Sequence, residues 1–186
     1  MKVVLASFDP VPAPKGASAH ILANLAALRE EHDVSLVTVG AQPLPGERHI
    51  VVSSAERNWL RRAVEFGDRC AGIFAKHDFD VHHVRSPFEG LATPPRSGLV
   101  YEVNAFYSVE ISYHYPRTIE LPAVRDKIVR MEAALLDRAD LLVTTNPVTA
   151  QHIVDRGGRP DAVQIVPNAP SFEPVGELSA PSQGPT

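Results

Sequence analysis

The chain has 186 residues, of which 44% are hydrophobic and 22% are charged, a composition typical of a single globular domain. It excludes collagen-like, coiled-coil and largely disordered proteins, and the formal net charge of −4 argues against nucleic-acid binding. The one cysteine, Cys70, excludes an internal disulfide and a cysteine-ligated zinc site. A lone thiol is typical of a reducing compartment, and no stretch approaches the roughly 20 apolar residues of a membrane span. Because the first residues also lack a signal-peptide pattern, we expect a cytoplasmic protein.

Short apolar runs alternate with helical patterns along the chain. The runs predict strands at residues 2–7, 34–39, 49–53, 81–84, 99–103, 141–145 and 163–166. The spacing between them predicts helices at residues 17–31, 56–76, 122–138 and 147–156, with a turn or short helix at 86–91. Near-continuous apolar strands that alternate with helices indicate a parallel sheet covered on both faces. The sequence therefore predicts a single Rossmann-like, doubly wound α/β domain with a seven-stranded, mainly parallel sheet.

Apolar residues at helical spacing define the faces that we expect to pack on this sheet. They are Ile21, Leu25 and Leu28 in the first helix, Leu60, Val64, Ala71 and Phe74 in the second, and Val124, Ile128, Met131 and Leu135 in the third. Residues 104–116 show no clean period and are interpreted as a loop. Proline, glycine and serine recur in residues 171–186, which we interpret as a linker or tail.

Ligands of an open parallel sheet bind beyond the carboxyl ends of its strands, so the loop after the first strand is a candidate site. Lys15 and Gly16 stand just before a predicted helix, whose free N–H groups and dipole favour an anion. The alternative is a plain loop in which Ser18 caps the helix. A dinucleotide site is not expected, because the loop lacks the G-x-G-x-x-G pattern.

The loop after the fourth strand carries a second group of polar residues. Arg85, Ser86 and Glu89 are candidates for contact with a ligand. The alternative, which we favour, is a polar loop in which Arg85 pairs with a neighbouring acid.

The segment after the fifth strand concentrates aromatic and polar side chains. They are Phe106, Tyr107, Tyr113, Tyr115, Glu102, Asn104, Glu110 and His114. Aromatic rings pack on the apolar faces of sugars, while carboxylates and amides bond hydroxyl groups. The mixture predicts a site for a carbohydrate or another polyol. The alternative is a loop whose aromatic residues only cover the edge of the sheet.

Other kinds of site receive little support. His82 and His83 are adjacent in a predicted strand and point to opposite faces, so they do not form a simple metal site. The sequence has no H-E-x-x-H, G-x-S-x-G or Walker pattern, and we expect neither a metal nor a cofactor. The helix at 56–76 carries basic residues that allow peripheral contact with an anionic membrane. The alternative for this helix is a solvated surface with pairs such as Glu65–Arg69.

The order of these features resembles the N-terminal domain of family 4 retaining glycosyltransferases of the GT-B fold. The resemblance rests on PKGASAHILANLAALREEHDVSLVTVG, VHHVRSP, VYEVNAFYSVEISYHYP, MEAALLDRADLLVTTNPVTAQHIVDRGG and QIVPNAP, and it covers residues 1 to 172. It implies that residues 1–170 form one half of a GT-B fold. The donor-binding C-terminal domain of that fold is not in this sequence.

The resemblance also implies roles for particular residues. It assigns Lys15, Gly16, Ala17 and Ser18 to the loop near the donor phosphates, and Asn104, Phe106, Tyr107 and Glu110 to the acceptor side. Ser86 and Glu102 join the acceptor-side candidates from their positions after the strands. Asn104 stands where many members have histidine, so the role of that histidine does not transfer, and no catalytic residue is assigned.

The sequence thus predicts the acceptor-binding half of an enzyme that transfers a hexosyl group from a nucleotide sugar to an acceptor hydroxyl. We expect this half to be inactive alone. One alternative is a non-catalytic subunit that docks a separate donor-domain polypeptide or another transferase. Another is half of a sugar-nucleotide epimerase.

Overall fold

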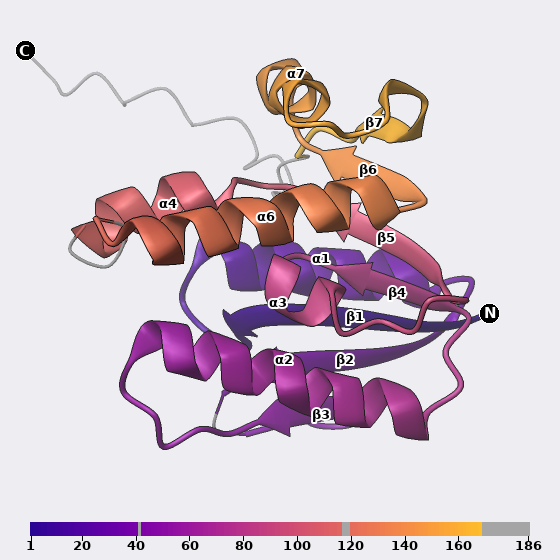
Figure 1. Ribbon diagram of the computed structural model, residues 1–186. Coiled ribbons are helices and arrows are strands. Elements are labelled where there is room, and N and C mark those ends of the chain that lie inside the picture. The colour runs from indigo at the N-terminus through magenta and orange to yellow at the C-terminus, as the bar shows by residue number, and fades with distance from the viewer. Residues whose placement is uncertain (41, 117–119, 169–186) are drawn as a thin grey trace, which may run out of the picture.

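One sheet of parallel strands forms the centre of the protein in the computed structural model, which describes residues 1–40, 42–116 and 120–168 (Figure 1). The strands are β1 (Lys2–Pro10), β2 (Asp33–Val39), β3 (His49–Val52), β4 (Val81–Val84), β5 (Gly98–Glu102), β6 (Leu141–Thr144) and β7 (Val163–Ile165). Their order is β3-β2-β1-β4-β5-β6-β7, and every neighbouring pair is parallel. The predicted seven-stranded α/β fold is confirmed, and residues 171–186 lie outside the described residues.

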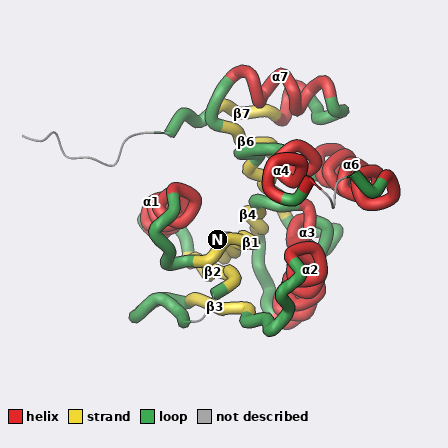
Figure 2. Tube along the Cα trace, turned by 90° about the vertical axis from the view of Figure 1, so that its left-hand side faces the viewer, coloured by secondary structure: helices red, strands yellow, loops and turns green. Residues whose placement is uncertain are grey.

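Helices cover both faces of the sheet. They are α1 (Gly16–Arg29), α2 (Trp59–Lys76), α3 (Pro87–Gly90), α4 (Tyr107–His114), α6 (Pro122–Arg138), α7 (Pro147–Asp155) and the 3₁₀ turn η1 (Pro160–Ala162). Figure 2 shows α1 on one face of the sheet and α2, α3 and α6 on the other. Among the described residues, no helix combines the length and the apolar character needed to cross a membrane.

The apolar face predicted for α1 is confirmed. Ile21 and Leu25 are buried and pack with Leu5 of β1 and Leu36 of β2. Leu28 is partly buried against the same cluster. These residues are spaced along one face of a helix, so a pattern within a few residues predicts the buried face of α1.

The apolar face predicted for α2 is confirmed only in part, because Phe74 is buried and Leu60 packs on the core while Val64 and Ala71 are exposed. Its buried residues are Ala63, Phe66, Gly67, Cys70 and Phe74. Val64 is 42% exposed, so the helix is rotated away from the stripe that includes it. The reason is close packing against α3, where a Cβ on Gly67 would lie 2.8 Å from the carbonyl oxygen of Phe88. A glycine at this contact lets the two backbones approach, and periodicity of large apolar residues does not detect it.

The loop predicted at residues 104–116 is also wrong, because α4 occupies most of it. The side chain of Phe106, at the N-cap position, makes no hydrogen bond to the helix. The cap comes instead from Glu132 of α6, which accepts bonds from the N–H and the hydroxyl of Ser108 at 2.8 and 2.7 Å. Ile111 of α4 is itself buried. A helix held by a distant residue leaves no local start signal in the sequence.

The order in which strands are added to the sheet reverses between β1 and β4. The chain places β2 and β3 on one side of β1, and it places β4 to β7 on the other. Helix α1 follows β1 on one face, while α3 follows β4 on the other, so the two connections diverge at this point (Figure 2). In open parallel sheets, a crevice at the carboxyl ends of such strands is the usual place for a ligand. The fold therefore directs attention to the residues that follow β1, β4 and β5.

Candidate functional site

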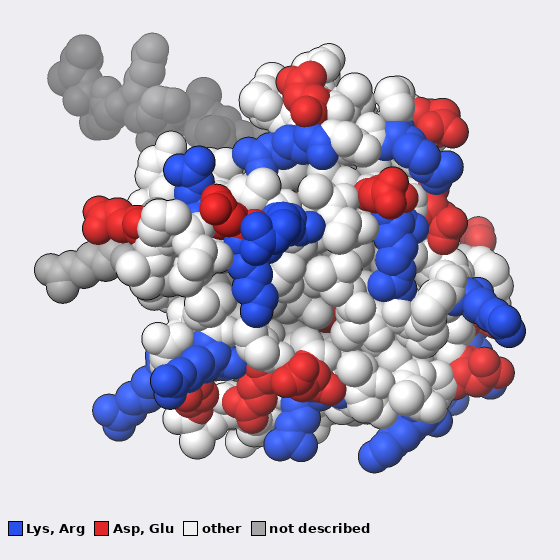
Figure 3. Space-filling model, viewed as in Figure 1, with Lys and Arg blue, Asp and Glu red and all other residues white. Residues whose placement is uncertain are grey.

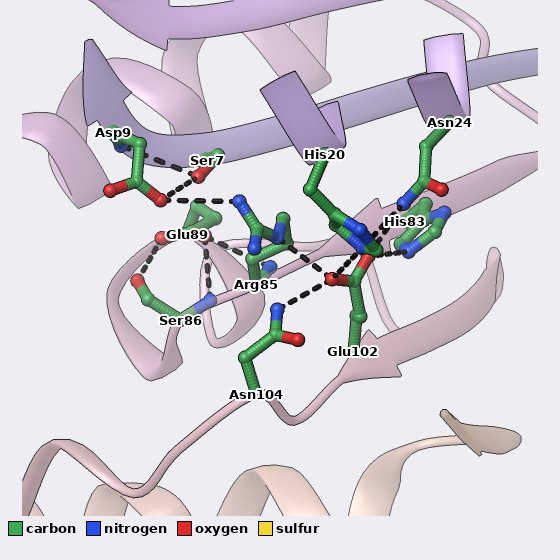
Figure 4. A network of polar contacts seen from close by, with 10 residues as sticks. All are labelled: Ser7, Asp9, His20, Asn24, His83, Arg85, Ser86, Glu89, Glu102 and Asn104. Carbon is green, nitrogen blue, oxygen red and sulfur yellow. Dashed lines mark hydrogen bonds and ion pairs between the residues drawn. The ribbon is translucent and has the colours of Figure 1, made fainter. Parts of the chain in front are cut away.

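A buried carboxylate at the end of β5 is the centre of a polar network at this reversal point (Figure 4). Glu102 is 2% exposed and comes from the last position of the strand. Its two oxygens accept five hydrogen bonds from other side chains, namely His20 Nε2 at 2.9 Å, Arg85 Nε at 3.0 Å, Asn104 Nδ2 at 2.5 Å, Asn24 Nδ2 at 2.9 Å and His83 Nε2 at 3.0 Å. The carboxylate therefore joins α1, β4, β5 and the loops that follow the two strands.

Glu102 is ionised. Burial by itself raises the pKa of its carboxyl group, but the hydrogen bonds from His20 and His83 and the charge of Arg85 outweigh burial and hold the pKa well below its usual range. An ionised carboxylate only accepts hydrogen bonds, so Nε2 of His20 carries a proton. Nδ1 of a neutral His20 is then an acceptor, on a side chain that is 27% exposed.

Local structure explains why these side chains point to one place. His20 and Asn24 are four residues apart on α1, so they lie on the same face of the helix. His83 and His82 alternate on β4, and His82 is buried against Phe74 on the opposite side of the sheet. The prediction that the two histidines face in opposite directions is confirmed.

Arg85 connects Glu102 to the end of β1. Its guanidinium donates to Glu102 and also to Asp9 Oδ2 at 3.2 Å, and its side chain is only 8% exposed. Asp9 in turn accepts a bond from the hydroxyl of Ser7 at 2.9 Å. The interpretation that Arg85 pairs with neighbouring acids is confirmed.

Ser86 lies behind this network and caps α3. Its hydroxyl donates to Glu89, and Glu89 accepts bonds from the N–H groups of Arg85 at 3.1 Å and Ser86 at 2.7 Å. Burial raises the pKa of Glu89 to about 7, against the lowering effect of the Ser86 bond. Ser86 is fully buried, and its bonds with Glu89 hold the loop that carries Arg85.

The residues predicted for the donor phosphates surround the start of α1. Lys15 occupies the N-cap position, and Lys15 and Gly16 are exposed. Ala17 is half-buried in the first turn. Ser18 is buried, and its hydroxyl accepts a bond from the N–H of Ala13 at 3.0 Å, which directs it back toward the loop.

The remaining acceptor-side candidates lie in different surroundings, and only one of them joins the Glu102 network. Asn104 joins the Glu102 network, while Phe106 is buried with the Arg156 guanidinium 4.1 Å from its ring centre. Tyr107 stacks on Trp59 with ring centres 5.9 Å apart. Glu110 is exposed on α4.

Five residues of the network were not predicted, namely Ser7, Asp9, His20, Asn24 and His83. The available signals were weak. His20 and Asn24 are polar residues at helical spacing on an otherwise apolar helix, and His83 interrupts a short apolar strand.

The parallel sheet and the polar crevice at its reversal point define a Rossmann-like domain of the kind that forms one half of a GT-B fold. Comparison with family models then names the family. Residues 14–170 match the model of glycosyltransferase family 4, and the chain belongs to that family.

Solved structures share this fold at low sequence identity. The lipopolysaccharide outer core galactosyltransferase WaaB matches with a TM-score of 0.62 and 12% identity, over 94% of this chain and 48% of WaaB. HepE from Anabaena, solved with UDP and glucose, matches with a TM-score of 0.57 and 15% identity, over 90% of this chain and 44% of HepE. UDP-GlcNAc 2-epimerase from Methanocaldococcus jannaschii matches with a TM-score of 0.59 and 10% identity, over 89% of this chain and 45% of the epimerase. The chain thus spans less than half the length of these proteins.

The comparison with curated proteins gives no match. Within the described part of the chain, no group of three or more histidine, cysteine or acidic side chains is arranged to hold a metal ion.

Proposed function

We propose that this domain is the acceptor-binding half of a glycosyltransferase that moves a hexosyl group from a nucleotide sugar to an acceptor hydroxyl. The observation that carries the proposal is the Glu102 network at the reversal point of a family 4 domain. The network places a histidine, an amide and an arginine at the edge where ligands of such sheets bind.

The network has a chemical use in transfer to a hydroxyl group. Glu102 orients His20 so that Nε2 is the donor to the carboxylate and Nδ1 is the acceptor. Such an acceptor can bond the hydrogen of a bound hydroxyl and take that proton as the new bond forms. Glu102 itself is surrounded by donors, so in this proposal it positions His20 and Asn104 and does not act as the base.

Departure of the nucleoside diphosphate requires stabilisation of negative charge. Lys15 and the N–H groups of Gly16, Ala17 and Ser18 at the start of α1 are suited to one part of that charge. In this proposal the other donor contacts belong to a second domain, which is why the isolated chain would be inactive. That domain would be part of the same polypeptide or a separate partner.

Two finer expectations stay predictions. A cytoplasmic location is supported only by the lone thiol of Cys70, which is buried.

Membrane contact through α2 is not favoured by Figure 3, where basic and acidic groups are interspersed over the face formed by α2, α3 and α6. In the alternative of a solvated helix, the Glu65–Arg69 pair given as an example is not formed among the described residues, and Glu65 accepts a bond from Ser54 at 2.6 Å.

An interaction subunit and an epimerase half are the alternatives. The epimerase half is retained as an alternative because the Methanocaldococcus jannaschii epimerase shares this fold. A test should therefore follow both transfer and epimerisation.

The experiment mixes the chain with a family 4 donor domain, a panel of nucleotide sugars and a panel of acceptors. We expect nucleotide release that depends on acceptor only when both halves are present. His20→Gln should lower this rate by about 100-fold or more, the scale of a lost general base, with little effect on donor affinity. The matched control His32→Gln replaces a histidine beyond the last turn of α1, outside the network, and should leave the rate unchanged.

Two results would contradict the proposal. One is turnover by the chain alone. The other is tight association with a partner protein combined with no binding of any acceptor, which would favour the interaction subunit.

A further inference from the structure

A polar hollow of about 400 Å³ lies beside the Glu102 network, at the carboxyl ends of β1, β2 and β3. Its wall includes Asp9, which also belongs to the network through Arg85. The loop before α1 contributes Lys15, and the first turn of α2 contributes Trp59 and Arg62. The hollow and the proposed acceptor site are therefore linked through Asp9.

The hollow carries an excess of positive charge. Within the described residues, neither Lys15 nor Arg62 forms an ion pair with a carboxylate, although both line the hollow. Asp9 is the one acid in the wall, and Arg85 already pairs with it at 3.2 Å. Two unpaired cations beside a single acid, which already accepts a bond from Arg85, favour an anion, since each cation gains a partner when the anion binds.

The hollow also has an aromatic wall. Trp59 meets the rings of Phe8 and Phe88 edge to face, with centres 5.8 and 5.7 Å apart, and it stacks on Tyr115 at 5.6 Å and on Tyr107 at 5.9 Å. Arg62 lies 5.9 Å from the centre of the Phe8 ring, so one of the cations is held against this wall. Aromatic surfaces of this kind pack on the apolar face of a sugar or cyclic polyol.

We propose that this hollow is the subsite for an acceptor that carries a phosphate monoester, a sugar phosphate or polyol phosphate. Lys15 and Arg62 bind the phosphate, and the aromatic wall that contains Trp59 and Tyr115 contacts the ring of the acceptor. Two unpaired cations match the two negative charges of a phosphate monoester better than the single charge of a carboxylate. The inference rests on the proposed function and names the chemical class of its acceptor.

This assignment changes the role expected of Lys15. The proposed function, like the resemblance, assigns Lys15 to the donor diphosphate. In the present inference Lys15 lies beside Arg62 and Trp59 and binds the acceptor phosphate, so that only the N–H groups at the start of α1 remain for the donor. A phosphate from either source has the same chemistry, so the experiment must separate the acceptor phosphate from the donor diphosphate.

The test measures equilibrium binding to the whole chain by calorimetry and by the fluorescence of Trp59, the only tryptophan of the sequence. The probes are glucose 6-phosphate, inositol 1-phosphate, the two unphosphorylated compounds, inorganic phosphate and uridine diphosphate. We expect at least one phosphate ester to bind about 10-fold or more tightly than its unphosphorylated form, with a change in fluorescence.

Arg62→Gln and Lys15→Gln should each weaken binding of that ester by about 10-fold, and Arg62→Lys should retain most of it. Arg61→Gln is the matched control, because Arg61 is the neighbouring residue of α2, is 79% exposed and pairs with Glu56 at 3.8 Å. It should bind like the unchanged protein. Circular dichroism verifies that each variant is folded.

Equal affinity for the ester and its unphosphorylated form would overturn the inference. So would an ester affinity that is the same in Arg62→Gln as in the unchanged protein. Tighter binding of uridine diphosphate through Lys15 and Arg62 would also overturn it, by assigning the subsite to the donor. Failure of the proposed function is a separate result. Phosphate esters would then still bind through these two residues, but no pairing with a donor domain would give transfer.

Discussion

Glu102 is a buried anion whose neighbours are all hydrogen-bond donors. Its pKa is held below the usual range by the bonds from His20 and His83 and by the charge of Arg85, against the effect of burial. Removal of the charge would leave these donors around a neutral group, a situation that costs more than loss of an exposed pair.

We predict that Glu102→Gln lowers the free energy of unfolding by about 3 kcal/mol at neutral pH. Because the pKa of Glu102 is lower in the folded protein than in the unfolded chain, its contribution is present above pH 4.5 and is lost as the pH falls further. Urea unfolding of the variant should therefore approach that of the unchanged protein in acid. Glu31→Gln, at an exposed turn, is the control and should change stability by no more than about 0.5 kcal/mol. Equal loss in both variants would contradict the network.

Glu89 has the opposite behaviour, because burial dominates its environment. Its pKa is raised to about 7, above the value of 4.5 for the unfolded chain. The folded protein therefore binds this proton more tightly. The stabilising contribution is complete below pH 4.5 and is lost as the pH rises through 7.

Glu89→Gln should remove this pH dependence. Relative to the unchanged protein, the variant should gain stability on the order of 3 kcal/mol between pH 4.5 and 7, since one pKa unit corresponds to about 1.4 kcal/mol. The difference between the two proteins isolates Glu89 from every other titrating group. Unfolding curves measured at several pH values supply this difference, and parallel stability profiles would show that Glu89 does not titrate in this range.

Among the secondary-structure elements, the contact between α2 and α3 depends on the absence of a side chain. A Cβ on Gly67 would lie 2.8 Å from a backbone oxygen of Phe88, which cannot move as a side chain does. Gly72, on the same helix, has open space where its Cβ would stand. The two glycines therefore form a matched pair.

We predict that Gly67→Ala destabilises the protein by about 1–3 kcal/mol, through displacement of α3. Gly72→Ala should stabilise it by up to about 1 kcal/mol, because alanine favours the helix. Thermal unfolding of both variants is the measurement. A loss of stability in both, or in neither, would show that the close approach of α2 and α3 is not what determines the result.

Helix α4 shows how one element depends on its neighbours. Glu132 of α6 caps its first turn, and Arg156 bonds both Glu132 at 3.2 Å and the hydroxyl of Ser108 at 3.0 Å. The position of Tyr107 and Glu110 is thus determined by residues far along the chain. Sequence periodicity within residues 104–116 contains no trace of this arrangement.

For the molecule as a whole, one sheet connects two apolar clusters on opposite faces. Trp59 contacts rings from β1, α3 and α4, so its fluorescence reports whether these elements are packed together. Parallel strands form only when distant segments meet, which favours a cooperative transition.

We therefore predict that the chain unfolds in one transition. The midpoint measured in urea by the fluorescence of Trp59 should coincide with the midpoint measured by far-ultraviolet circular dichroism. Loss of the fluorescence signal at lower urea, before the helical signal, would instead show that the α2–α4 region unfolds separately from the sheet.

The sequence by itself determined the order of strands and helices along the chain, the parallel sheet and the loops that carry the candidate ligand-binding residues. These features follow from apolar periodicity, which neighbouring residues impose within a few positions of each other. It also singled out Glu102, Asn104 and Arg85 as polar residues at the ends of strands or just after them.

Only the tertiary structure decided what those residues do. Glu102 meets His20 across 82 residues of sequence and Arg85 across 17. The buried face of α2, the existence of α4 and the hollow between Lys15 and Arg62 likewise depend on contacts between distant segments. The physical reason is that local patterns record which residues prefer to be buried or helical, whereas the partner of a buried charge is chosen by the packing of the whole sheet.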